Sequence, residues 1–147
     1  MVKYDFPCKA YTKHYLEFCF GSPVIMRNDS YIGKNFYRLV EDQYEHQDSK
    51  LKSLYDSVAV IIITQDVHMR KGFMLSKSGV AEFNHLVEDF FKKQINAMLL
   101  AKMDSGVEIN LAINNFIYPT FRMDESIMTH ECIRKDFQRY RKKLEAA

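Results

Sequence analysis

The sequence predicts an α+β fold, mainly α-helical, with about five helices, a small central β-ribbon and a basic C-terminal helix. Three observations lead to this prediction. Apolar residues recur at helical spacing over most of the chain. One β-branched run, residues 57–64, interrupts that pattern. The last segment has apolar residues along one stripe and cations around the rest of its circumference.

Length and composition indicate a globular protein. The chain has 147 residues, which predicts a single domain over residues 1–147. Apolar residues make up 47% and charged residues 27%, a mixture that disordered chains do not have. Because the chain contains 11 Phe and 9 Tyr but no Trp, we expect a core built mainly from Phe, Tyr and Met.

The cysteines and the hydropathy pattern indicate in which cellular compartment the protein is expected. The chain has three cysteines and no CxxC pair, which is typical of reduced thiols in the cytoplasm. Cys8 and Cys19 are expected on the buried face of a helix. Since no apolar run approaches the roughly 18 residues of a membrane span, we expect no membrane association. The N-terminal residues also lack a signal-peptide apolar region, so we expect an intracellular protein.

The first part of the chain is expected to form two helices and a loop. Asp5 is a suitable N-cap for a helix with Pro7 in its first turn, and this helix should close at Gly21. Ser30 can cap a second helix that runs to about Glu41. The polar residues 41–56 lack clear periodicity and predict a long exposed loop.

The β-branched run 57–64 is the clearest strand, and its continuity predicts a central or doubly buried position. Residues 73–75, next to Gly72, are the expected second strand of the ribbon. Because two strands alone are marginally stable, they should pack on helices or pair with a second copy of the chain. A homodimer that pairs the 57–64 strands therefore stays open.

Residues 78–103 predict the longest helix, which should end at the Asp-Ser-Gly sequence 104–106. Ser105 and Glu108 have the spacing of a capping box that restarts a helix. The following segment has helical spacing, although its apolar residues also alternate and leave a strand open. Pro119 is expected to end this element. A polar link over 119–128 should follow, with the last helix capped by Thr129.

The last helix carries the main functional signal. An apolar stripe is expected to anchor it on the domain, formed by Ile133, Phe137, Tyr140 and Leu144. Residues 134–147 contain six Lys or Arg against two acidic residues, a net +4, whereas the other residues together carry −2. This asymmetry indicates a polyanionic partner. The expected phosphate contacts are Arg134, Lys135, Arg139, Arg141, Lys142 and Lys143, and Gln138 is the candidate for reading a base edge.

Residues 106–145 read as a helix, a link and a second, basic helix, which resembles the helix-turn-helix plan of DNA-binding proteins. The link of about ten residues is longer than the usual 3–4 and contains no glycine. The closing pattern Asp-Phe-Gln-Arg-Tyr-Arg-Lys-Lys also resembles the ends of small accessory proteins of phages and mobile elements. These resemblances imply a non-enzymatic DNA-binding regulator or accessory factor with duplex DNA as its partner.

Two other classes of function stay open. A protein–protein adaptor or inhibitor would use the 41–56 loop or spare aromatic surface on the 78–103 helix. An enzyme would assemble a site from dispersed residues such as His14, His68, His85 and Asp66. The Glu82-x-x-His85 pair lacks the second copy and the extra Glu residues that a di-iron bundle needs. We therefore expect no metal, no cofactor and no catalytic residues.

Overall fold

The computed structural model describes residues 2–41, 54–64 and 74–147, and the statements below concern these residues. The chain divides into two compact units, Met1–Glu88 and Asp89–Ala147, and each unit is described by itself. Helix α5 (Lys77–Asp104) begins in the first unit and ends in the second. The expectation of a single domain over residues 1–147 stays a prediction.

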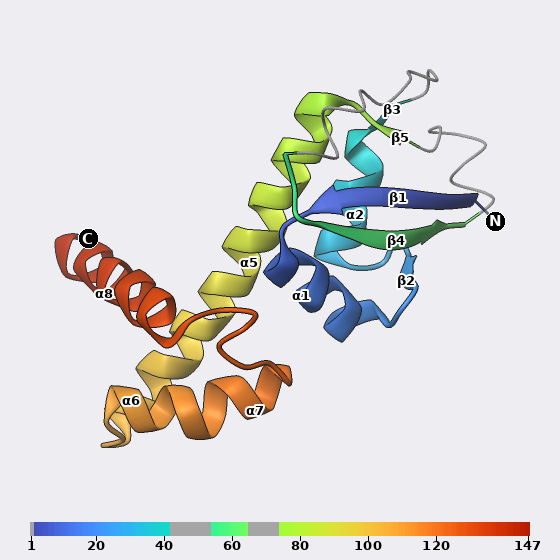
Figure 1. The fold of residues 1–147 in the computed structure, drawn as a ribbon. Helices are drawn as coiled ribbons and strands as arrows, with labels where there is room; N and C mark the ends of the chain where they lie inside the picture. The colour runs from blue at the N-terminus through green and yellow to red at the C-terminus, as the bar shows by residue number, and fades with distance from the viewer. Residues whose placement is uncertain (1, 42–53, 65–73) are drawn as a thin grey trace. The chain divides into compact units, whose positions relative to one another are not determined.

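The predicted fold class is confirmed: the protein is α+β and mainly helical. Among the described residues there are five helical segments, because α6 (Ile109–Ala112), the π-helix η1 (Ile113–Ile117) and α7 (Tyr118–Phe121) follow one another without a break (Figure 1). The other four are α1 (Ala10–Phe20), α2 (Tyr31–Leu39), α5 and α8 (His130–Ala146). No helix in the described ranges combines the length and apolar character needed to cross a bilayer.

The first unit is built on a three-stranded sheet with the order β1-β4-β2. Strand β1 (Val2–Cys8) runs antiparallel to β4 (Ser57–Ile63), and β2 (Val24–Met26) runs parallel to it. The central position predicted for the β-branched run is thus confirmed. Because β4 already has a neighbour on each side, the structure gives no support to a dimer built by pairing two β4 strands.

The predicted partner of β4 was wrong. Residues 74–75 form β5 (Met74–Leu75), but β5 pairs with β3 (Val40–Glu41) in a separate two-stranded sheet (Figure 1). The strands that pair with β4 come from the first 26 residues instead. The two segments 57–64 and 73–75 are close in the sequence, which suggested a ribbon. Strand β4 instead pairs on both sides with strands that lie more than 30 residues earlier in the sequence.

The predicted N-terminal helix starting at Asp5 was also wrong, because Val2–Cys8 is a strand. Tyr4 and Phe6 are buried, whereas Lys3 and Asp5 are exposed, so the segment has the alternation of a half-buried strand. Pro7 is tolerated because β1 is an edge strand, where a missing backbone donor does little harm.

The predicted buried helix face with Cys8 and Cys19 does not form. Cys8 is buried in strand β1, and burial raises the pKa of its thiol to about 12, which keeps the thiol protonated and unreactive. Cys19 is exposed at the end of α1. Both thiols are free, as is Cys132 on α8.

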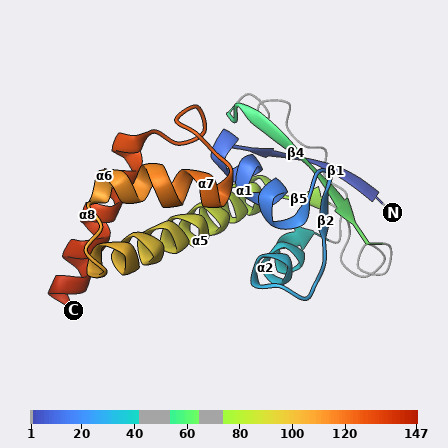
Figure 2. The ribbon, with the colours of Figure 1, turned by 90° about the horizontal axis from the view of Figure 1, so that it is seen from below.

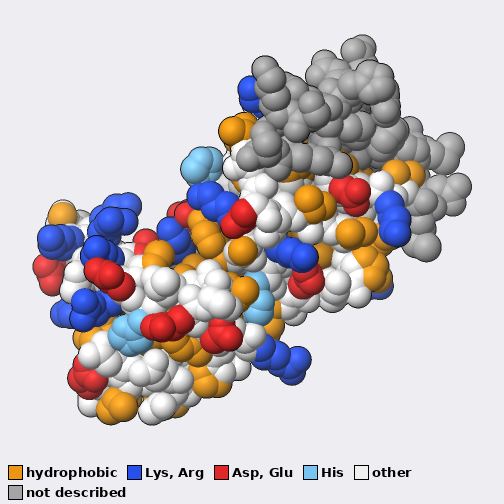
Figure 3. Space-filling model, in the orientation of Figure 1, with side chains coloured by type: hydrophobic (Ala, Val, Ile, Leu, Met, Phe, Trp, Pro, Cys, Tyr) orange, Lys and Arg blue, Asp and Glu red, His pale blue; other side chains and the backbone are white. Residues whose placement is uncertain are grey.

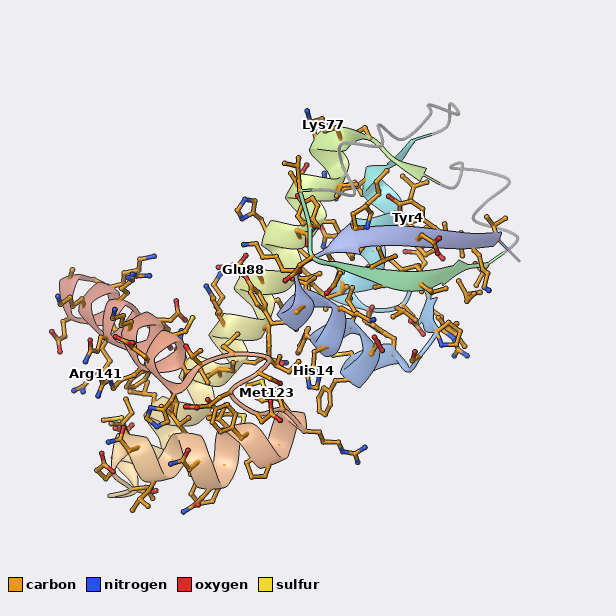
Figure 4. All side chains as sticks on the ribbon, in the orientation of Figure 1. Tyr4, His14, Lys77, Glu88, Met123 and Arg141 are labelled. Carbon is orange, nitrogen blue, oxygen red and sulfur yellow. The ribbon has the colours of Figure 1, made fainter. Side chains whose placement is uncertain are left out.

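Helices cover one face of the three-stranded sheet (Figure 2). Helix α1 lies against β4 and β2. Phe83 of α5 joins the layers, since its ring centroid lies 5.3 Å from that of Phe6 in β1 and 5.2 Å from that of Phe36 in α2. Tyr4, labelled in Figure 4, extends this cluster with its ring 6.5 Å from Phe36. The expectation of an aromatic core is confirmed in this unit.

Helix α2 begins at its predicted cap, because the Ser30 hydroxyl accepts a hydrogen bond from the Gly33 N–H at 2.9 Å. A Cβ at Gly33 would lie 1.7 Å from the Arg27 carbonyl oxygen, so only glycine fits there. The helix ends at Leu39, shortly before the predicted Glu41, because Val40 leaves the helical conformation to enter β3. Of the predicted 41–56 loop, most lies outside the described residues.

The second unit packs the last part of α5 with the α6–η1–α7 segment and α8. Phe91 of α5 makes an edge contact with Phe121 of α7, their ring centroids 5.1 Å apart. Lys102 near the end of α5 lies over the ring of Phe116 in η1 at 3.9 Å. The remaining buried apolar side chains come from these segments and from the residues between α7 and α8: Ile95, Leu99, Ala112, Ile113, Ile117, Met123, Met128, Ile133 and Phe137.

Helix α5 ends where the Asp-Ser-Gly sequence predicted. Gly106 has φ +95°, and Val107 N–H reaches back to the Lys102 carbonyl at 3.1 Å. This is the Schellman arrangement, which requires a left-handed residue. The predicted capping box was wrong, because Ser105 bonds to the Lys102 carbonyl at the end of α5. Glu108 is the N-cap of α6 instead, accepting from two backbone N–H groups with its own carboxylate.

Residues 109–121 are helical, which excludes the strand alternative for this segment. Pro119 does not end the helix as predicted. The turn before it is a π-turn, in which the Tyr118 N–H bonds to the Ile113 carbonyl. This wider turn makes room for a ring that would clash in a regular α-helix. The helix ends at Phe121, followed by Arg122 in the left-handed conformation with φ 51°.

Asn84 gives a test of how α5 is held in the first unit. Its side-chain amide donates to the carbonyls of Pro7 at 3.0 Å and Val80 at 2.9 Å, and the residue is 4% exposed. Asn84→Ala should lower the free energy of unfolding by about 1–2 kcal/mol, since it leaves the Pro7 carbonyl without this donor. Urea denaturation measures the loss. His85→Ala, at the exposed neighbouring position, should change it by less than about 0.5 kcal/mol; equal losses would contradict the assignment.

Candidate nucleic-acid interface

Helix α8 begins at the predicted cap, where the Thr129 hydroxyl accepts from the Cys132 N–H at 3.1 Å. Its apolar stripe is buried only over the first turns: Ile133 is 2% and Phe137 1% exposed, whereas Leu144 is 47% exposed. Tyr140 lies between these extremes. The prediction that Leu144 anchors the helix was therefore wrong, because the buried contact with the unit ends before the last turn.

A polar contact fixes the rotation of α8 on α5. The Asn96 amide donates to a carboxylate oxygen of Asp136 at 3.0 Å, and Asn96 is 4% exposed. Asp136 is one of the two acidic residues in the basic segment 134–147. Because its carboxylate is turned toward α5, its hydrogen bond goes to Asn96 and its charge lies on the inner side of the helix. Beyond Glu131 in the first turn, the outer side of α8 carries cations.

All seven predicted site residues are exposed, and basic side chains gather over α8 in Figure 3. Lys135 pairs with Glu131 at 3.0 Å, and the Lys135 ammonium lowers the pKa of that carboxyl. Such an exposed pair contributes little and exchanges readily with solvent. No carboxylate of the described residues lies within ion-pair distance of the other five cations, namely Arg134, Arg139, Arg141, Lys142 and Lys143.

Helical spacing places six of these seven residues in two stripes, and Lys143 lies outside both. Lys135, Arg139 and Lys142 recur at four and three residues, on the side of α8 opposite Ile133 and Phe137; we call them the outer stripe. Arg134, Gln138 and Arg141 form a second, flanking stripe about 100° away on the helix circumference. Arg141 is labelled in Figure 4, and its guanidinium carbon lies 5.9 Å from the centroid of the Phe137 ring.

Two surface hollows border α8, one on each side. The first, of about 310 Å³, lies between α5 and α8, and its lining contains both cations and carboxylates. The lining residues are Lys92, Thr129, Glu131, Cys132, Lys135, Asp136 and Arg139. The second, of about 810 Å³, lies between α6, η1, the link and the start of α8. Its lining consists of Asn110, Asn114, Glu125, Thr129, His130, Glu131 and Arg134. We call it the amide hollow after its two asparagines.

Sequence reasoning did not identify Asn110 and Asn114 as site residues. They are spaced four residues apart and are exposed, which was the available signal. They form part of a hollow only because α6 and η1 lie next to the start of α8, and no local sequence pattern predicts this contact. Met123, labelled in Figure 4, is 8% exposed in the link that brings the two helices together. The Tyr118 hydroxyl holds the same link by donating to the Met128 carbonyl at 2.9 Å.

The residues weighed for other functions lie elsewhere. Glu82 pairs with Arg38 at 3.2 Å, and His85 is exposed. His14 is half-buried on α1 and borders neither hollow around α8. Asp66 and His68 lie outside the described residues. The apolar stripe of the 78–103 helix is buried, with Phe83, Val87, Phe91, Ile95 and Leu99 at most 2% exposed. That stripe belongs to the protein's own core and offers no surface to a partner.

The docking of α8 can be tested with two residues of the same stripe. Phe137→Ala should lower the free energy of unfolding by about 3–5 kcal/mol, because it removes a fully buried ring. Leu144→Ala should cost less than about 1 kcal/mol, because that side chain is 47% exposed. Chemical denaturation followed by far-UV circular dichroism gives both values. A Leu144→Ala loss as large as that of Phe137→Ala would mean that the whole stripe is docked.

We compared the chain with known protein families, curated proteins and solved structures. No protein-family model, curated protein or solved structure matches the chain. The assignment of a function therefore rests on the residues and geometry described above.

Proposed function

We propose that this chain is a non-enzymatic nucleic-acid-binding protein that contacts duplex DNA through helix α8. The observation that carries the proposal is the set of five exposed cations on α8 that have no carboxylate partner among the described residues. A protein that neutralises phosphates with such side chains releases condensed counterions, and this release drives binding.

The dimensions of α8 suit this role. Arg134 and Lys143 are nine residues apart, so the cations extend over about 13 Å at 1.5 Å per residue. The major groove of B-DNA is about 12 Å wide and admits one α-helix. In this proposal the outer stripe and the flanking arginines contact phosphates, and Gln138 presents its amide to a base edge.

The α6–α7 segment, the link and α8 then correspond to the two helices and the turn of a helix-turn-helix-like reader. The link from Arg122 to Thr129 is longer than in the usual motif, but the Tyr118–Met128 hydrogen bond and the buried Met123 side chain hold it in place. A regulator or accessory factor of a phage or mobile element, working in a reducing cytoplasm, is the biological role that we propose. A homodimer that presents two α8 helices would fit a two-fold DNA site.

A protein–protein adaptor is the second candidate, and one observation favours it. The first unit exposes large apolar side chains, with Phe18 at 42%, Ile25 at 45% and Tyr31 at 59%. Single exposed apolar residues are common on protein surfaces, however, whereas a run of unpaired cations on one helix is more specific. The five residues of the α5 stripe are buried, so an adaptor would have to use other side chains.

The proposal predicts a steep salt dependence. If about five phosphates are neutralised, the logarithm of the affinity for duplex DNA should fall against the logarithm of salt concentration with a slope of about −4 to −5. Removing two contacts with Arg139→Gln and Lys142→Gln should make this slope shallower by about 2. Fluorescence anisotropy with a labelled duplex, over a series of salt concentrations, measures both slopes.

Lys34→Gln with Lys77→Gln is the matched control, because it removes the same charge from exposed positions of the first unit. It should leave the slope unchanged. An equal effect of the two double variants would show that net charge alone attracts DNA. Absence of binding at low salt would reject the proposed function, and loss of a protein partner through Tyr31→Ala without loss of DNA binding would favour the adaptor.

A further inference from the structure

The amide hollow differs in chemistry from the outer stripe of α8. The outer stripe contains only cations, whereas the hollow contains one permanent cation, Arg134, against the carboxylates of Glu125 and Glu131. Because the Lys135 ammonium pairs with Glu131 at 3.0 Å, the hollow has no clear excess of either charge. A phosphate would gain less there than on the outer stripe. The hollow is therefore suited to an uncharged polar group.

The lining of the hollow offers both donors and acceptors. Asn110 and Asn114 each present an amide with two donors and an acceptor, Arg134 presents a donor fork, and the two glutamates accept. These are the side-chain types that match base edges: amides pair with adenine, guanidinium with guanine, and carboxylates with the cytosine amino group. None of the seven described residues that line the hollow is apolar.

The polar groups of the hollow are held on rigid elements. Asn110 lies in the first turn of α6, which the Glu108 carboxylate caps. Asn114 lies in η1, which is fixed by the buried Ile113 and Ile117 and by the contact of Lys102 with Phe116. π-turns inside helices are frequent at functional sites. Neither asparagine side chain has a protein partner among the described residues, so both amides are available to a ligand.

The hollow also continues the flanking stripe of α8. Arg134 belongs to both, and Gln138 and Arg141 follow it at four and seven residues on the same side of the helix. A nucleic acid whose phosphates lie on the outer stripe would bring its bases to this side.

We propose that the amide hollow takes the hydrogen-bonding edge of a nucleobase, with Asn110 and Asn114 as the groups that select it and Arg134, a phosphate contact, at its border. This inference rests on the proposed function, because the phosphate contacts of α8 hold the nucleic acid in place. It adds a specificity site on α6 and η1 to a surface otherwise formed by α8. The base comes either from a groove edge of a duplex or from an unpaired nucleotide.

The experiment measures affinities for four single-stranded homo-oligonucleotides and for duplexes of matched length but different base composition. Wild-type protein should discriminate among the bases by about 5- to 150-fold, the range for one well-formed contact. Asn110→Ala with Asn114→Ala should reduce this spread to about twofold or less, because the amides then make no contact with the base edge. The salt slope should not change, since no charge is removed.

Asn115→Ala is the control, because Asn115 is exposed on the same π-helix but does not line the hollow. Asn115→Ala should keep the differences in affinity among the bases. If these differences occur only among the single strands, the ligand is an unpaired base. If they also occur among the duplexes, the ligand is a groove edge. If the double variant Asn110→Ala/Asn114→Ala keeps the wild-type differences in affinity among the bases, the inference is overturned. A uniform loss of affinity for all bases with a shallower salt slope also overturns it. The proposed function stands in both cases. No binding by wild-type protein overturns both.

Discussion

The orientation of helix α8 depends on the contacts that one of its sides makes with its own unit. Ile133 and Phe137 are buried, and Asn96 of α5 binds the carboxylate of Asp136. Together these contacts determine which side of α8 faces inward. If α8 docked at another rotation, Asp136 would face solvent and some of the cations would face the unit. The exposed cationic surface is thus a consequence of how α8 is docked, and not of its charge alone.

Local patterns were sufficient for much of the fold. Serine and threonine caps located the starts of α2 and α8, the Asp-Ser-Gly sequence located the end of α5, and the β-branched run located β4. The neighbours of β4 were missed because they are distant in the sequence. For residues 2–8, the alternation of Tyr4 and Phe6 with Lys3 and Asp5 was itself a strand signal, but Asp5 and Pro7 were interpreted as the start of a helix. The short segment Pro7–Cys8 has no decisive propensity, so tertiary pairing determines its conformation.

One part of the candidate site could be predicted from the sequence, and the other part could not. Its cations are predictable because a 3.6-residue period separates them from the apolar stripe within a single helix. The failure of Leu144 to dock is not predictable, since the length of the buried contact depends on the partner segments. The amide hollow is likewise a product of two helices and a link. Its asparagines are ordinary surface residues in the sequence and gain a role only next to Arg134.

The central claim is that α8 is the surface that meets a nucleic acid. NMR titration of the isotope-labelled full chain with a short duplex tests it most directly, because the Arg Nε–H and backbone N–H signals report each residue separately. The account predicts progressive shifts for residues 134–143 of α8, together with those around Asn110 and Asn114, and none for the strands β1, β4 and β2. Shifts confined to the first unit, with the α8 signals unchanged at saturating duplex, would contradict it.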